Sequence, residues 1–265
     1  MQKLNEVQFF CFPNNKDLSI LYADKNSLKT RLFKALSIQI SPKEGFLLRL
    51  RKTQLGHYLS KFDKSDLLII KLPIHKNLKI GYQNNNKIIF FEFDNNDKPI
   101  KVLKVNHTKN YEEFEFLGYS IIENYCKKEY YNKRRFIKLA LEKRWQEILE
   151  NNFLHGDFTH FNVLLSEQNT IHFIDAKKVK NSILFDHFYF YSYYVQCLER
   201  CQTISSNDIF EIKNDLQNII SEICKLENLQ KVLYDIKMDD AIGVTVSERE
   251  SKLMEFSNFL LKNEK

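Results

Sequence analysis

The sequence predicts an α+β protein of two lobes, one β-rich and one mainly helical with a short embedded β-hairpin. Between residues 46 and 105, short runs rich in Ile, Val, Leu and Phe alternate with polar clusters, as strands and turns do. From Lys109 onward, apolar residues recur at intervals of three and four, which indicates helices. We expect an N-terminal lobe over 1–127, which holds these strands and the first helix after them, and a C-terminal helical lobe over 128–265.

The expected elements follow from these local patterns. In the first lobe, strands are expected over 17–23, 45–51, 66–72, 87–93 and 99–105, with a helix over 27–38. The polar segment DNNDK joins the last two strands as a hairpin. Helices are expected over 109–121, 130–150, 182–201, 208–226 and 247–263, and the hairpin of the second lobe joins 163–165 to 170–175.

The composition narrows the class of protein. The 265 residues are 43% hydrophobic and 28% charged, enough apolar side chains for a real core. The five cysteines contain no CxxC pair and no companion histidine at metal-ligand spacing, which favours reduced thiols. No apolar run approaches the length of a membrane-spanning helix, and no secretory leader begins the chain, so we expect a cytoplasmic protein.

With a net charge of +6, the chain could attract nucleic acid or anionic lipid, and the arrangement of its basic residues decides between them. Basic residues are not arranged as a stripe with interleaved aromatics, so no nucleic-acid partner is expected. The densest basic cluster, at 127–138, is typical of a solvated helix face. A peripheral contact of this helix with anionic lipid at the inner face of the membrane stays open as the alternative.

Four polar residues surround the predicted hairpin of the second lobe. His155, Asp157 and Asn162 belong to HGDFTHFN, with Asn162 five positions after Asp157, and Asp175 ends the strand of TIHFID. Transfer of a phosphoryl group from a nucleotide needs a carboxylate near the acceptor hydroxyl and oxygen ligands for Mg²⁺. An HGD tripeptide alone is a weak signal, because Asp and Asn are common in loops. Three polar positions at these spacings, beside apolar strands, are far more specific.

This arrangement resembles the protein-kinase-like phosphotransferases, in which a catalytic Asp precedes a metal-binding Asn by five positions and a second Asp follows the next strand. Gly156, where protein kinases have Arg, is similar to the aminoglycoside phosphotransferase and choline kinase branch. HGDFTHFNVLL, FID and FDHFYFY resemble bacterial kinase-like proteins of cell-surface polysaccharide synthesis with the motif HGDFTPWN. Here His160 and Phe161 replace Pro and Trp.

The resemblance implies a bilobal protein-kinase-like fold and a role for each motif residue. Asp157 would orient and deprotonate the acceptor hydroxyl, and Asn162 and Asp175 would hold Mg²⁺ on the phosphates of ATP. His155 and Asp186 would support the catalytic loop. The implied activity is that of an ATP-dependent kinase acting on an alcohol group. The implied acceptor is a sugar of a surface glycan or lipopolysaccharide precursor, with choline-like alcohols, aminoglycosides or proteins as alternatives.

The same mechanism requires a strand cation in the first lobe that holds the nucleotide phosphates, and a carboxylate on the following helix that positions it. Lys104 in PIKVLKV is the candidate cation, and strand alternation places it on the opposite face from Lys101. We favour Glu113 as the carboxylate, because Phe116 and Leu117 would bury the adjoining helix face. Its alternatives are Glu112 and Glu115.

Three features depart from the family pattern. The expected glycine-rich phosphate loop, KIGYQNNNK, contains only Gly81. The stretch between Lys104 and Asp157 is short for a full helix, hinge and long helix, and no adenine pocket is assigned. Lysines follow Asp175 in DAKKVK, where they would bind an anionic acceptor or form a solvated pair. The sparse glycines favour an alternative function, a catalytically weak pseudokinase-like nucleotide-binding or scaffold protein.

Overall fold

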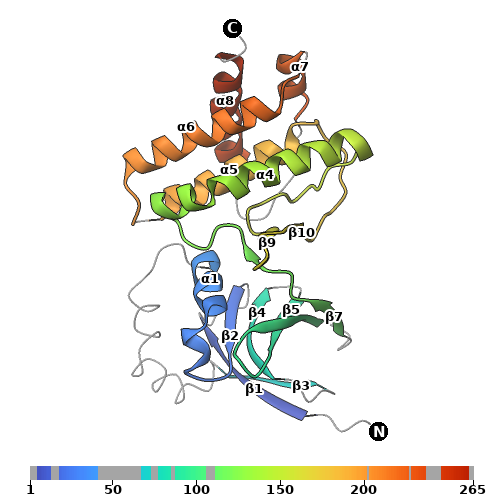
Figure 1. Ribbon diagram of the computed structural model, residues 1–265, viewed down its shortest axis with the longest axis vertical. Coiled ribbons are helices and arrows are strands. Elements are labelled where there is room, and N and C mark those ends of the chain that lie inside the picture. Colours follow the sequence, from blue (N-terminus) through green and yellow to red (C-terminus); the bar gives the residue numbers. More distant parts are fainter. Residues whose placement is uncertain are drawn as a thin grey trace. The chain divides into compact units, whose positions relative to one another are not determined.

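A computed structural model describes residues 5–12, 18–40, 67–72, 77–84, 87–105, 111–201, 203–226, 228–236 and 246–262. The chain divides into two compact units, Met1–Leu117 and Gly118–Lys265, so the division lies before the predicted boundary at residue 127. An antiparallel sheet forms the first unit, and helices dominate the second (Figure 1). The expected α+β class is confirmed at this level.

The first unit is built on a seven-stranded sheet in the order β3-β1-β2-β4-β5-β6-β7, and each neighbouring pair is antiparallel. Its strands are β1 (Asn5–Phe12), β2 (Leu18–Tyr22), β3 (Leu67–Leu72), β4 (Leu78–Asn84), β5 (Lys87–Phe93), β6 (Pro99–Val105) and β7 (Tyr111–Glu115). Four of the five expected strands are confirmed, as is the β5–β6 hairpin. The strand expected over 45–51 lies outside the described residues.

The two faces of this sheet are buried in different ways. Phe9, Leu21, Phe90 and Leu103 pack together on one face as part of a hydrophobic cluster. On the other, α1 (Arg31–Ile40) packs against β2 and β4, and the Phe33 ring meets the Tyr22 ring edge-on at 6.0 Å. A 3₁₀ turn, Ser27–Lys29, precedes α1, so the helix expected over 27–38 is confirmed in its main part.

The helix expected over 109–121 is wrong. Residues 111–115 form β7, which pairs with β6 so that Phe114 lies opposite Val102. Gly118 then has φ +144, and a Cβ there would lie 2.4 Å from the Leu165 carbonyl oxygen. The apolar residues at intervals of three and four therefore lie in or beside two short strands that a glycine with positive φ separates, and tertiary pairing overrides the helical period.

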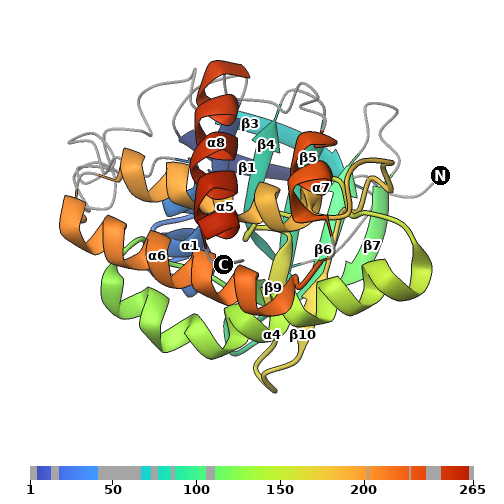
Figure 2. The ribbon, with the colours of Figure 1, turned by 90° about the horizontal axis from the view of Figure 1, so that it is seen from above.

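The second unit surrounds one buried helix. Its helices are α4 (Lys127–Asn151), α5 (Phe185–Arg200), α6 (Ser206–Ile223), α7 (Leu229–Tyr234) and α8 (Val246–Lys262). A small sheet has the order β10-β9-β8, from β8 (Tyr119–Ser120), β9 (Val163–Leu165) and β10 (Ile171–Phe173). Most of α5 is buried, and it packs against α6 and α8, while α4 lies along α6 (Figure 2). The other expected helices and the hairpin are confirmed.

The basic cluster at 127–138 joins α4 to α6. Three cations of α4 pair with acidic residues of α6: Lys127 with Glu211, Arg134 with Asp215, and Lys138 with Glu222. Part of this cluster therefore serves helix packing. Across the described residues, no helix is both long and apolar enough to cross a bilayer.

Candidate functional site

The segment Leu154–Asn162, here called the HGD loop, begins where α4 ends. The helix stops at Asn152, whose left-handed backbone (φ 50) turns the chain while its N–H still bonds the Ile148 carbonyl at 2.9 Å. Leu154 then forms an isolated antiparallel bridge with Val179. The HGD loop is thus fixed at its start by a helix cap and by the segment that follows Asp175.

Asp186 holds the backbone of the HGD loop from the first turn of α5. Its carboxylate is fully buried and accepts hydrogen bonds from His155 N–H at 2.7 Å and Gly156 N–H at 3.0 Å. It also accepts one from Arg144 Nε at 2.8 Å. A buried carboxylate is tolerated when it is paired and hydrogen-bonded, and these three donors meet that condition.

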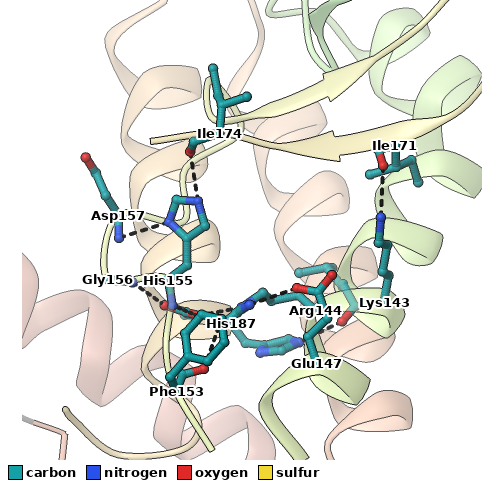
Figure 3. A network of polar contacts seen from close by, with 12 residues as sticks. Lys143, Arg144, Glu147, Phe153, His155, Gly156, Asp157, Ile171, Ile174 and His187 are labelled. Atoms are coloured by element: carbon teal, nitrogen blue, oxygen red, sulfur yellow. Dashed lines mark hydrogen bonds and ion pairs between the residues drawn. The ribbon is translucent and has the colours of Figure 1, made fainter. Parts of the chain in front are cut away.

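Arg144 extends this anchor to α4. Its side chain is 2% exposed and also reaches Glu147 at 2.9 Å and the Phe153 carbonyl at 2.7 Å (Figure 3). The guanidinium is therefore shared between the buried Asp186, its own helix and the residue before the HGD loop. Sequence reasoning missed Arg144, because it stands among other basic residues of a helix that looks solvated.

His155 links the HGD loop to the residue before Asp175. Its Nδ1 accepts from Asp157 N–H at 3.3 Å, so Nε2 carries the ring proton and donates to the Ile174 carbonyl at 2.9 Å (Figure 3). Burial lowers the pKa of His155 below its ordinary value, which favours this neutral form. One imidazole thus sets the positions of Asp157 and Ile174 together.

Asn162 is oriented by the backbone of Asp157. Its Nδ2 donates to the Asp157 carbonyl at 2.7 Å, and Ile174 N–H donates to the Asn162 carbonyl at 3.1 Å. This orientation leaves Asn162 Oδ1 without a hydrogen-bond donor among the described residues. Asn162 therefore offers an oxygen ligand from a fixed side chain.

The Asp157 carboxylate has one fixed oxygen. Lys177 Nζ lies 3.0 Å from Asp157 Oδ2, and the Lys177 backbone N–H donates to the His155 carbonyl at 2.7 Å. Asp157 Oδ1 accepts no hydrogen bond from the part of the chain that the structure describes. The carboxylate is thus held by a cation while one oxygen stays available to a ligand.

Asp175 lies two residues after β10 in the left-handed backbone region, with φ +58, and it is exposed. Asp tolerates this region better than most residues, and such conformations cluster at functional sites. Ile174, directly before it, is bonded to both His155 and Asn162. The contacts therefore bring Asp157, Asn162 and the backbone leading into Asp175 together.

Asn162 and Asp175 suit Mg²⁺ by the chemistry of their donors. Mg²⁺ prefers oxygen ligands and is commonly held by one or two side chains, with phosphate oxygens and water completing the shell. No described part of the chain gathers three or more His, Cys, Asp or Glu side chains that could hold a metal alone. Asn162 and Asp175 would therefore leave most of the ligand shell of such a cation to water or to a bound ligand.

Gly156 is required by the conformation of the HGD loop. Its φ is +78, and a Cβ there would lie 2.7 Å from Val179 Cγ1 and 2.8 Å from Val179 Cγ2. Any other residue would combine an unfavourable backbone with a collision. The glycine that distinguishes HGD from the protein-kinase motif is thus explained by the segment after Asp175.

Two buried histidines near the site, to which the sequence alone assigned no role, serve packing. His160 Nε2 lies 2.8 Å from the Tyr125 hydroxyl, and His187 Nε2 lies 3.0 Å from the Leu141 carbonyl. Burial lowers the pKa of His160 to about 3 and that of His187 to about 4. Their burial could have been predicted from their neighbours, because both stand among aromatic residues in THFN and FDHFYF.

In the first unit, Lys104 lies on β6 with its Nζ 5.1 Å from the centre of the Phe114 ring. The expected placement of Glu113 on a helix is wrong, because Glu113 belongs to β7 and lies opposite Leu103. Glu113 therefore occupies the other face of the sheet from Lys104, and its Oε2 lies 3.3 Å from Lys101 Nζ. Glu112 is the residue opposite Lys104.

Gly81 serves strand packing. It lies inside β4, opposite Leu21 on one side and Phe90 on the other. A Cβ at this position would lie 2.4 Å from the Ile89 carbonyl oxygen. The one glycine of the expected phosphate loop is thus explained by close strand contact.

Comparison of the chain with protein-family models, with curated proteins and with solved structures finds no match. The resemblance to protein-kinase-like phosphotransferases therefore stays a prediction. It depends on the HGD loop and on the residues that hold it.

Proposed function

We propose that the chain is a Mg²⁺-dependent phosphotransferase with a bilobal protein-kinase-like fold, which moves the γ-phosphate of ATP to a hydroxyl group. The observation that carries the proposal is the HGD loop. Asn162 is held by a hydrogen bond to the Asp157 carbonyl and the Asp157 carboxylate by an ion pair with Lys177, and each keeps a side-chain oxygen that accepts no hydrogen bond from the described residues. One oxygen suits an acceptor hydroxyl and the other a hard cation.

In this proposal Asp157 is the catalytic base. Its Oδ1 accepts a hydrogen bond from the acceptor hydroxyl and takes the proton as the oxygen attacks phosphorus. Asn162 and Asp175 hold Mg²⁺, which when bound neutralises charge on the phosphate oxygens. His155 and Asp186 position the loop through the bonds to Ile174, Asp157 N–H and the loop backbone.

Lys104 is the proposed nucleotide-binding cation of the first unit. It shares one face of the β6–β7 pair with Phe114, and its ammonium is the group that would pair with the nucleotide phosphates. The proposed acceptor is a sugar hydroxyl of a surface glycan or lipopolysaccharide precursor, and it rests on the likeness of HGDFTHFN to HGDFTPWN. ATP as donor favours a cytoplasmic location, including the inner face of the membrane.

A second candidate function is nucleotide binding or scaffolding with little transfer. Gly81 favours it, because the one glycine of KIGYQNNNK is needed inside β4. Without glycines the backbone cannot approach phosphates as closely as a glycine-rich loop does. ATP would then bind weakly, chiefly through Lys104 and the metal.

The test compares wild type with Asp157→Asn and with Asp235→Asn, a matched change at an exposed residue far along the chain. ADP release with Mg²⁺ and a panel of sugar acceptors should fall by about 10²–10⁴-fold in Asp157→Asn alone, because the general base is lost. Thermal unfolding is followed in parallel with ATP, with and without Mg²⁺.

The outcomes separate the two candidates. Mg²⁺-dependent stabilisation by ATP that is lost in Asp175→Ala, without any turnover, would favour the binding protein. Turnover at the wild-type rate in Asp157→Asn would remove Asp157 as the base. The absence of both ATP turnover and stabilisation by ATP would contradict both candidates.

A further inference from the structure

The HGD loop contains no cation of its own. The segment HGDFTHFN has no Lys or Arg, although phosphoryl transfer develops negative charge on the transferred group beside the base. The cation that reaches Asp157 comes from Lys177, two positions after Asp175. The positive charge beside Asp157 therefore comes from the segment 176–180 and not from the HGD loop.

Lys177 is held in place by backbone pairing. Its N–H donates to the His155 carbonyl at 2.7 Å, and Val179 bridges to Leu154. The segment 176–180 therefore lies along the start of the HGD loop as a short antiparallel partner. This pairing fixes the Cα of Lys177 and leaves its side chain, 59% exposed, to extend to Asp157 Oδ2 at 3.0 Å.

The neighbouring Lys178 is used differently. Its backbone is left-handed, with φ +52, and its Nζ lies 5.5 Å from the centre of the Phe153 ring. Adjacent lysines in one exposed segment thus have separate contacts, one with the candidate base and one with an aromatic ring. A generally solvated lysine pair does not account for this division.

We propose that Lys177 positions Asp157 and binds the phosphoryl group in transfer, an inference that rests on the proposed phosphotransferase function. One N–H of its ammonium group holds Asp157 Oδ2, so that Oδ1 meets the acceptor hydroxyl. The two remaining N–H groups donate to oxygens of the γ-phosphoryl group. An ammonium in this position offsets charge that grows in the transition state, which is an effect on kcat.

The step balances as follows. The acceptor oxygen forms a bond to the γ-phosphorus, and the bond from that phosphorus to the β–γ bridging oxygen breaks. ADP leaves with the bond electrons, and the acceptor proton passes to Asp157. Lys177 keeps its protons throughout and acts by charge and hydrogen bonding.

The experiment measures kcat and KM for ATP in wild type, Lys177→Met, Lys177→Arg and the control Lys178→Met. We expect Lys177→Met to lower kcat by about 10²-fold while KM changes by less than about threefold, because the contact strengthens in the transition state. Lys177→Arg should recover part of the rate. Lys178→Met should stay within about twofold of wild type, and thermal unfolding should show all four folded.

A double variant tests whether Lys177 acts through Asp157. If it does, Lys177→Met should slow Asp157→Asn clearly less than it slows wild type, because residues that act as a unit are strongly non-additive. Full multiplication of the two losses would overturn the positioning role, as would equal rates in Lys177→Met and Lys178→Met. Absence of Asp157-dependent turnover in the wild type would instead overturn the proposed function, and this inference with it.

Discussion

The HGD loop and the β6–β7 hairpin carry the candidate residues of the two units, and they are built in opposite ways. In the loop, Asp186 and His155 are buried and bonded to backbone on both sides. In the hairpin, Lys104 lies on a half-covered strand, and four of the five residues of β7 are exposed. The loop is shaped by many buried contacts, and the hairpin by its strand register.

This difference predicts how strongly substitutions in each region should lower the stability of the protein. A change in the buried network of the loop leaves charges and backbone groups without partners, which is costly. A substitution on the exposed hairpin costs little, because water can form hydrogen bonds with the groups that lose their partner. Stability should therefore respond strongly to substitutions around the loop and weakly to those on β7.

The largest effect should come from Asp186→Ala. This change removes the buried carboxylate partner of Arg144, which keeps only Glu147 and the Phe153 carbonyl, and it leaves the N–H groups of His155 and Gly156 without an acceptor. Breaking a buried pair on one side typically costs about 3–5 kcal/mol, so urea unfolding should show a loss of this size.

A paired control separates stability from loop geometry. Arg144→Met with Asp186→Leu removes both charges and should recover part of the lost unfolding free energy, because the backbone groups of the loop stay without partners. It should not recover any nucleotide response, because the loop backbone still lacks its acceptor. Wild-type stability in Asp186→Ala alone would break the contrast between loop and hairpin.

Gly156→Ala should have the next largest effect. The new methyl group meets Val179 and the backbone must keep φ near +78, so we expect a loss of about 2–3 kcal/mol in urea unfolding. The same change in a Val179→Ala background should cost about 1–2 kcal/mol, because only the backbone term remains. Equal costs in the two backgrounds would show that Val179 does not confine this position.

A moderate effect should appear with pH. The pKa values of His160 and His187 fall to about 3 and about 4 in the fold, from 6.5. Below pH 6.5 the two histidines are protonated in the unfolded chain and stay neutral in the folded chain. Stability therefore falls as the pH is lowered from 6.5 towards about 4. Each histidine contributes a slope of up to about 1.4 kcal/mol per pH unit.

The pH slope can be assigned with His160→Gln. Carboxylates contribute to the same titration, so the comparison is between the slopes of the two proteins from pH 6.5 to pH 4. The variant should have the shallower slope, whatever its stability at neutral pH. Parallel slopes would show that His160 takes up its proton without unfolding.

The smallest effect should follow Glu113→Gln. The pair of Glu113 with Lys101 is a surface ion pair, and we expect a change in stability of less than about 1 kcal/mol. ATP affinity should stay within about twofold in a titration, because Glu113 lies on the other face of the sheet from Lys104. Lys104→Met is the comparison, with an expected loss of about tenfold.

The elements formed by local patterns were predictable, and those set by long-range pairing were not. The β5–β6 hairpin follows from two apolar runs joined by DNNDK, and α4 and α5 follow from their helical period. β7 was missed because YEEFE has no strong strand composition and depends on β6 for its hydrogen bonds. The pairing of Glu113 with Lys104 failed with it, since a strand sends neighbouring glutamates to opposite faces.

The candidate site divides in the same way. The spacing of His155, Asp157 and Asn162 within one loop could be read from the sequence because the residues are close along the chain. The contacts of Arg144 with Asp186 and of Lys177 with Asp157 could not, because they exist only after α4, α5 and the segment 176–180 have packed. A lysine or arginine beside other basic residues gives no local sign of which other residue its side chain contacts.

The anchor formed by Arg144 and Asp186 has a consequence for the order of assembly. The two side chains come from α4 and α5, on either side of the HGD loop in the chain, and both touch its backbone or the residue before it. The loop conformation is therefore a product of helix docking and cannot precede it. A fragment that ends before residue 186 should keep the HGD sequence and lose the conformation of the loop. Truncation therefore separates the presence of the motif from the formation of the site.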